Sequence, residues 1–189
     1  MTRFVVIGGD AAGMSAAAQS TRGATAPDVV VFERGVHTSY AACGLPYYVG
    51  GLVPDADQLV ARSPEEHRAR GIDVRIRHEV VGIDTDARSV VVRDLADGRE
   101  RTEPYDHLLV ATGAVPLRPP WPGVDAPGVF GLHSIPEATA ILDAVRARDP
   151  RRAVVVGAGY IGLEIAEAFE RLGLDVTVVE RLDLSLIHI

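Results

Sequence analysis

The chain has a single cysteine, Cys43, in the segment 39–48 (SYAACGLPYY). A cysteine reacts as its thiolate, which exchanges electrons or attacks a substrate. Gly44 and Pro46 are typical of a loop that turns into a helix, so Cys43 is expected near a helix N-terminus, which favours a thiolate. The fifth residue after Cys43 is Tyr48, so there is no CxxxxC dithiol pair. The alternative is a structural thiol that packs as a small hydrophobe.

A glycine-rich motif precedes this segment. A strand at residues 3–7 leads into a glycine turn at 8–13 (GGDAAG) and a small-residue helix at 14–18. A second strand at 28–32 ends in an acid, Glu33. This order is typical of a dinucleotide site, in which glycines let the backbone approach a pyrophosphate and the acid accepts a ribose hydroxyl. Asp10 stands where the fingerprint has its second glycine.

A second motif of the same kind begins roughly 150 residues later. A strand at residues 152–156 leads into a glycine turn at 157–162 (GAGYIG) and a helix at 163–172. A second strand at 175–179 ends in an acid, Glu180. Here the GxGxxG fingerprint is unbroken, and the acid follows Gly157 by 23 residues. Two such motifs imply two dinucleotide cofactors.

The residues between the motifs predict further strands and helices. Strands are expected at residues 72–76, 80–83, 89–95, 99–103 and 105–110, and helices at 63–71 and 136–148. Asp97-Gly98 predicts a hairpin turn. The predicted fold class is α/β, with two Rossmann-like dinucleotide-binding units, the second incomplete. We expect domains at 1–113 and 151–183, joined by a connection and helix over 114–150.

Composition excludes several classes of function. The net charge of −7 argues against nucleic acid or an anionic membrane as the main partner. No apolar run reaches the ~20 residues of a membrane span. A lone cysteine excludes an intrachain disulfide framework and fits a reducing compartment. The strand at the N-terminus leaves no room for a signal peptide, so a cytoplasmic protein without a metal site is expected.

The last six residues, 184–189 (LSLIHI), match the translation of a common transposase sequencing adapter. The second motif has only two predicted strands before them. We therefore expect a truncated reading frame with a non-native tail.

The motifs at 8–13, 39–48, 111–116 (ATGAVP) and 157–162 together resemble the flavin-dependent pyridine nucleotide–disulfide oxidoreductases. The resemblance covers nearly all of residues 1–183 and is to the single-cysteine branch. That branch contains coenzyme A disulfide reductases, NADH oxidases and NADH peroxidases.

The resemblance implies that the first motif binds FAD and the second NADH or NADPH. The implied FAD-binding residues are Gly8, Gly9, Gly13, Glu33, Arg34, Val80, Val81, Thr112 and Gly113. The implied NAD(P)H-binding residues are Gly157, Gly159, Tyr160, Gly162 and Glu180. Glu180 favours NADH, whereas the adjacent Arg181 could accommodate a 2′-phosphate. Tyr160 resembles the aromatic residue that gates the nicotinamide, or simply packs on the helix.

Cys43 is the implied catalytic residue, cycling through a mixed disulfide or a sulfenic acid. The implied substrate residues, from coenzyme A disulfide reductases, are Ser15, Gln19, Arg22 and Ser39. The spacing of the first three would place them on one helix face, although this could be an ordinary solvated face.

Peroxidases and water-forming oxidases carry a histidine where this chain has Ala11. This favours reduction of coenzyme A disulfide or a similar small disulfide. Ala42, in place of an amide, weakens that case. An NADH oxidase or peroxidase and a non-catalytic nucleotide-binding module remain alternatives. The resemblance also implies a homodimer, and a continuation of the FAD domain beyond these residues, so this fragment is expected to bind FAD weakly and to be inactive.

Overall fold

The computed structural model describes residues 2–23, 25–183 and 185–188. Their contacts group them into two compact units. The first unit holds the described residues of Met1–Tyr40 with Val60–Ala114, and the second those of Ala41–Leu59 with Val115–Ile189. The predicted α/β fold class is confirmed, because each unit has a parallel sheet with a glycine turn leading into a helix.

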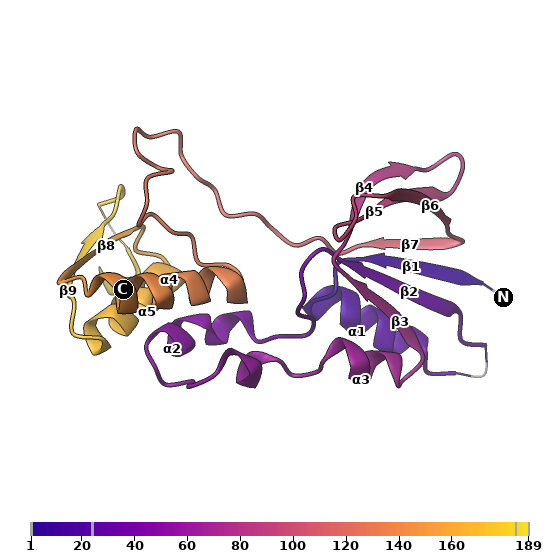
Figure 1. The fold of residues 1–189 in the computed structure, drawn as a ribbon, viewed down its shortest axis with the longest axis horizontal. Helices are drawn as coiled ribbons and strands as arrows, with labels where there is room; N and C mark the ends of the chain where they lie inside the picture. Colours follow the sequence, from indigo (N-terminus) through magenta and orange to yellow (C-terminus); the bar gives the residue numbers. More distant parts are fainter. Residues whose placement is uncertain (1, 24, 184, 189) are drawn as a thin grey trace. The chain divides into compact units, whose positions relative to one another are not determined.

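The first unit is built on a parallel sheet of four strands in the order β3-β2-β1-β7 (Figure 1). These strands are β1 (Arg3–Ile7), β2 (Asp28–Glu33), β3 (Ile72–Ile76) and β7 (His107–Val110). Helix α1 (Ala11–Ser20) connects β1 to β2. The carboxyl ends of β1 and β2 therefore lie side by side, with Ile7 paired to Phe32.

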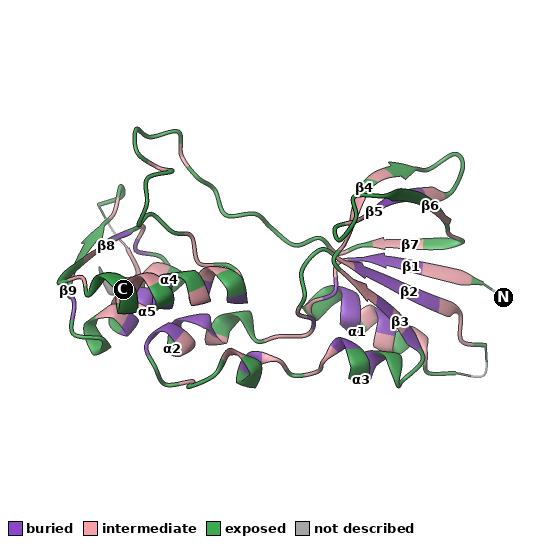
Figure 2. Ribbon diagram, viewed as in Figure 1, coloured by how far each residue is buried: buried purple, intermediate pink, exposed green. Residues whose placement is uncertain are grey.

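Both faces of this sheet are covered, because the valine-rich strands alternate their side chains between two cores. On one face Val6 and Val31 pack with Met14 and Ala17 of α1. On the other face Val5 and Phe32 pack against a second sheet. Figure 2 shows the buried centre of β2 and the buried carboxyl half of β1.

The second sheet of this unit is antiparallel, in the order β4 (His78–Asp84), β5 (Ser89–Asp94) and β6 (Glu100–Pro104). Val90 and Val92 of β5 supply its buried side. The predicted turn at Asp97-Gly98 joins β5 to β6, and Gly98 has a φ of +75°. The register of β4 against β5 shifts between Val80 and Gly82.

A capping box begins helix α3 (Pro64–Arg68), as predicted from Ser63-Pro64-Glu65-Glu66. The Ser63 hydroxyl accepts a hydrogen bond from the Glu66 N–H, and the Glu66 carboxylate accepts one from the Ser63 N–H. Pro64 and His67, one helical turn apart, are buried.

The second unit contains a two-stranded parallel sheet, β8 (Arg152–Val156) and β9 (Asp175–Val179). Its helices are α2 (Leu45–Val49), α4 (Ile135–Arg148) and α5 (Tyr160–Arg171), with 3₁₀ helices η1 (Ala42–Gly44), η2 (Ala56–Leu59) and η3 (Leu186–His188). Helix α2 packs against both α4 and α5.

Within the part of the chain that the structure describes, the β8–β9 sheet is covered on one face only. Val155 is 7% exposed on the face that meets α5. On the opposite face, Val154, Val156 and Val179 are 64%, 59% and 49% exposed. The β8–β9 sheet thus leaves a row of valines exposed to water.

None of the helices formed by the described residues has the length and apolar character that crossing a bilayer requires.

Candidate functional site

The first glycine turn follows β1 and brings three backbone segments into close contact. Gly8 has a φ of +107°, and its N–H donates a 2.9 Å hydrogen bond to the Phe32 carbonyl. A Cβ at Gly8 would lie 2.8 Å from the Ala111 carbonyl carbon, and one at Gly13 would collide with the Gly8 carbonyl. No side chain fits at either position, so the turn keeps bare backbone at the N-terminus of α1.

Glu33, at the end of β2, is held against this turn. The Gly9 N–H donates to Glu33 Oε2 at 2.7 Å, and the Gly35 N–H donates to Oε1 at 2.6 Å. A carboxylate has further lone pairs, so each oxygen can still accept a hydroxyl. The neighbouring Arg34 side chain is 70% exposed and lies 3.9 Å from Glu79, a weak ion pair.

Asp10 departs from the glycine fingerprint for a structural reason. It is the N-cap residue of α1, and its Oδ1 accepts a 3.1 Å hydrogen bond from the Tyr40 N–H. The carboxylate therefore ties the glycine turn to Tyr40, three residues before Cys43. A glycine could not form this link.

The other predicted FAD-binding residues differ in their surroundings. Thr112 and Gly113 are exposed beside the glycine turn, since a Cβ at Gly8 would lie 3.4 Å from the Thr112 nitrogen. Val80 is partly buried and packs against the core that includes Val90 and Val92 of β5. Val81 is 40% exposed, at the register shift of β4.

The second glycine turn repeats the geometry of the first. Gly157 has a φ of +103°, and its N–H donates to the Val179 carbonyl at 2.8 Å. A Cβ at Gly162 would collide with the Gly157 carbonyl, whereas Gly159, the N-cap of α5, faces open space. Tyr160 is 75% exposed, so it is free of the packing role considered for it.

Glu180 occupies the position that Glu33 has in the first turn. Its Oε2 accepts from the Ala158 N–H at 2.8 Å, and its Oε1 accepts from Arg181 and Leu182. The hydrogen bonds from the Ala158 and Leu182 backbone lower the pKa of Glu180. The acid is thus charged at neutral pH and can accept a hydroxyl.

Cys43 is exposed and lies in η1, directly before α2. Its predicted place near a helix start is confirmed. The segment is anchored around the thiol, because Leu45, Pro46 and Val49 of α2 are buried. A Cβ at Gly44 would lie 2.5 Å from the Leu59 side chain, so the backbone here also packs closely.

Of the predicted substrate residues, Ser15 and Gln19 are exposed on α1. The prediction that one helix face presents Arg22 as well is wrong, because α1 ends at Ser20 and Arg22 follows its C-cap. The Ser20 and Thr21 hydroxyls bond to carbonyls three residues earlier, an arrangement that competes with helix continuation. The Arg22 N–H still bonds to the Gln19 carbonyl at 3.2 Å.

Ser39 has an unusual backbone and an unpredicted partner. Its φ is +50°, which costs a non-glycine residue about 1 kcal/mol. Its N–H bonds to the Gly9 carbonyl and its carbonyl to the Ala61 N–H. Its Oγ lies 3.0 Å from Nε2 of His67, which is 1% exposed. No local sequence pattern marks this histidine, because its partner Ser39 lies 28 positions away along the chain.

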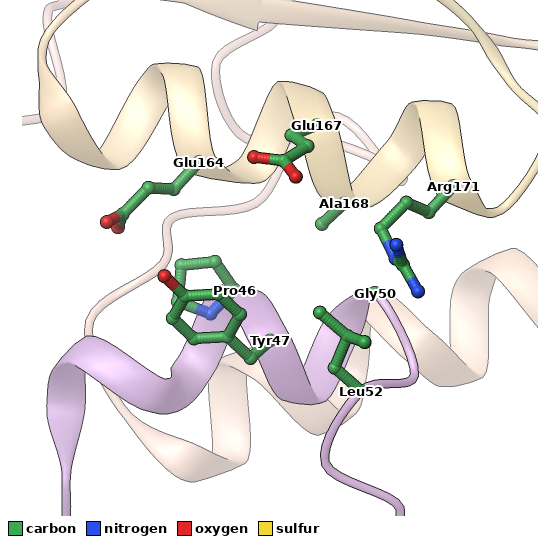
Figure 3. Close-up of a pocket in the computed structure, with 8 residues that line it drawn as sticks. All are labelled: Pro46, Tyr47, Gly50, Leu52, Glu164, Glu167, Ala168 and Arg171. Atoms are coloured by element: carbon green, nitrogen blue, oxygen red, sulfur yellow. The ribbon is translucent and has the colours of Figure 1, made fainter.

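A groove between α2 and α5 is lined by Pro46, Tyr47, Gly50, Leu52, Glu164, Glu167, Ala168 and Arg171 (Figure 3). Its volume is about 20 Å³, which is room for about one water molecule. It cannot hold a dinucleotide or coenzyme A. No metal-binding group of three or more His, Cys, Asp or Glu side chains occurs among the described residues.

Known proteins share this arrangement. The chain is 38% identical over 181 residues to an NADH oxidase of Enterococcus faecalis, covering 96% of this chain and 40% of the relative. It is 43% identical over 178 residues to an NAD(P)H sulfur oxidoreductase (CoA-dependent) of Pyrococcus abyssi, covering 94% and 39%. The chain therefore spans about 40% of the length of these relatives.

Among solved structures, an NAD-dependent persulfide reductase from A. fulgidus is similar, with a TM-score of 0.92 and 40% identity. The match covers 97% of this chain and 34% of that one. The sequence profile of the pyridine nucleotide-disulphide oxidoreductases matches residues 2–188. The two glycine turns, their acids and these similarities agree, and the chain belongs to the pyridine nucleotide-disulphide oxidoreductase family.

Proposed function

We propose that the whole protein is a flavin-dependent NAD(P)H oxidoreductase that passes electrons to Cys43 and reduces coenzyme A disulfide or a similar small disulfide. The observation that carries the proposal is an exposed, unpaired thiol in a chain with two glycine turns. A structural cysteine would be buried with the apolar residues of α2.

The family is FAD-dependent, and the first turn fits such a group. Gly8 and Gly13 leave no side chain between the backbone and a pyrophosphate, and Glu33 is oriented to accept a ribose hydroxyl. Gly157, Gly162 and Glu180 fit the reductant in the same way. FAD, when bound, supplies the chemistry that accepts a hydride from NAD(P)H and passes two electrons on.

Cys43 performs the exchange with the substrate. Its thiolate attacks one sulfur of the disulfide, a new S–S bond forms, and the other half leaves as a thiolate that takes up a proton. Two electrons and a second proton then cleave the mixed disulfide, which releases the second thiol and restores Cys43. The short 3₁₀ and α-helical segment keeps the sulfur exposed to the substrate.

Two observations favour a coenzyme A disulfide as substrate. Ala11 begins α1 without a proton donor, whereas the resemblance implies a histidine there in peroxide and oxygen chemistry. The P. abyssi relative is named as CoA-dependent. The name of the E. faecalis relative supports the second candidate, an NADH oxidase that passes through a Cys43 sulfenic acid.

The remaining parts of the proposal concern the whole protein. We place it in the cytoplasm, where a lone thiol stays reduced. We also propose that the whole protein is a homodimer.

The test uses the full-length protein. NADH and NADPH oxidation is measured with coenzyme A disulfide, oxygen or hydrogen peroxide offered separately, alongside Cys43→Ser. We expect turnover with coenzyme A disulfide, lost in Cys43→Ser while bound flavin stays unchanged. Turnover with oxygen or peroxide alone would establish the oxidase instead. Turnover of the disulfide that survives in Cys43→Ser would contradict the role of the thiol.

A further inference from the structure

We infer that His67 is a positioning residue for substrate that acts through Ser39. It donates a hydrogen bond to the Ser39 hydroxyl, so the proton of that hydroxyl is left to bond to a substrate oxygen. This rests on the proposed function and on the role of Ser39 as a substrate residue, which the family resemblance implies. Ser39 lies four residues before Cys43 along the chain, and His67 lies on α3.

The surroundings of the imidazole decide the direction of this hydrogen bond. His67 Nε2 lies 3.0 Å from Ser39 Oγ, while Nδ1 is buried and has no hydrogen-bond partner among the described residues. A neutral imidazole has one N–H and one bare nitrogen. If Nδ1 carried the proton, a buried N–H would be orphaned, which is rarer in proteins than a bare acceptor without a partner. The proton is therefore on Nε2, and Ser39 Oγ accepts.

The imidazole is kept neutral by its environment. Burial is the main cause that lowers the pKa of His67, and Arg62 and Arg70 add to it, while Glu66 acts in the opposite direction. A charged ring would also need a second acceptor at Nδ1, which the described residues do not provide.

The backbone of Ser39 is held in place by its own hydrogen bonds. Its N–H and carbonyl are bonded to Gly9 and Ala61, and its φ is +50°. With the backbone fixed and Oγ accepting from His67, the hydroxyl proton is the group left to interact with a ligand. It suits an acceptor such as a phosphate, carbonyl or hydroxyl oxygen of coenzyme A.

The hydrogen bond is tested first without any substrate. Full-length protein with ¹⁵N-labelled histidine is measured by long-range ¹H–¹⁵N NMR at pH 8, and the His67 signals are assigned by their loss in His67→Gln. We expect a protonated Nε2 and a bare Nδ1. A protonated Nδ1 would overturn the inference.

The consequence for substrate is tested by a double-mutant cycle with Ser39→Ala and His67→Phe. Each change should raise KM for coenzyme A disulfide about ten-fold, and the double variant should be no worse than either. His67→Gln, whose amide also donates, should recover most of the loss. Additive losses, a fall in kcat alone, or no recovery in His67→Gln would contradict positioning through Ser39.

The two hypotheses fail in different ways. If the unsubstituted protein does not turn over coenzyme A disulfide, the proposed function fails and the substrate role of Ser39 with it, while the NMR result still decides the hydrogen bond. If turnover is normal but Ser39→Ala leaves KM unchanged, only the present inference fails. Should His67→Phe not fold, Ser39→Ala and His67→Gln give the same discrimination.

Discussion

The Ala158 N–H donates a 2.8 Å hydrogen bond to the carboxylate of Glu180, across the second glycine turn. The first turn has the same relationship, from Gly9 to Glu33 at 2.7 Å. Each acid is thus oriented by the backbone of its own turn before any nucleotide arrives. Preorganisation of this kind reduces the cost of ordering a side chain on binding.

Glu180→Ala should change the choice of reductant. A hydrogen bond to a charged group contributes about 1.5–3 kcal/mol, so we expect KM for NADH to rise at least about ten-fold. KM for NADPH should rise less or fall, because the repulsion of a 2′-phosphate is removed. Steady-state kinetics with both reductants measure this, with Glu180→Gln as the uncharged control. Equal changes in both KM values would show that Glu180 does not select the ribose.

Gly162→Ala and Gly159→Ala form a matched pair in the second turn. The first places a methyl group against the Gly157 carbonyl, and overpacking of this kind costs about 1–3 kcal/mol. The second faces open space and should cost under about 1 kcal/mol, the difference between glycine and alanine at an N-cap. Thermal unfolding of the full-length protein compares them. An equal loss in Tm would mean that the Gly162 contact is not limiting.

His67 should make stability depend on pH. Its pKa lies below the ordinary value of 6.5 because burial disfavours the charged ring. The unfolded chain therefore binds a proton that the folded chain rejects, and stability falls as pH drops below about 6.5, by at most about 1.4 kcal/mol per pH unit. Above that pH the contribution is complete.

The check is the difference in urea midpoint between the unsubstituted protein and His67→Gln, measured from pH 5 to pH 8. Carboxylates titrate in both proteins, so their effect cancels in the difference. A difference that does not change with pH would contradict the lowered pKa.

Asp10→Gly restores the glycine fingerprint but removes the tie to Tyr40. We expect a loss of about 1–2 kcal/mol, mainly from the hydrogen bond to the Tyr40 N–H, because glycine in place of aspartate at an N-cap costs only a few tenths of a kcal/mol. Asp10→Asn keeps an acceptor oxygen and should retain most of the stability. If Asp10→Gly were as stable as Asp10→Asn, the link would contribute nothing.

Local patterns predicted most elements of this fold. The β-branched runs gave the strand positions of β1, β3 and β8 without a shift, and Ser63-Pro64-Glu65-Glu66 specified a complete capping box. These features depend on neighbours in sequence, which the sequence displays directly.

Helix starts were predicted less well. The two helices after the glycine turns were expected to begin at Met14 and Leu163, but begin at Ala11 and Tyr160. Gly13 and Gly162 have poor helix propensity. Their first turns form nevertheless, because each glycine packs against the backbone of its own turn.

The long-range contacts could not be predicted. The hydrogen bonds of Asp10 with Tyr40 and of Ser39 with His67 join residues 30 and 28 positions apart. Neither has a periodicity that marks it. The roles assigned to the cofactor and substrate residues, the domain limits and the origin of residues 184–189 stay predictions; Leu184 and Ile189 lie outside the described residues.

The bare valine face of β8–β9 has a consequence for synthesis on the ribosome. Val154, Val156 and Val179 emerge with the second glycine turn, and within the described residues nothing covers them. A nascent chain at this stage presents a hydrophobic strip beside unpaired strand edges, the kind of surface that chaperones shield and that leads to self-association. Exposure of the β8–β9 sheet is thus the aggregation-sensitive stage in the biogenesis of this protein.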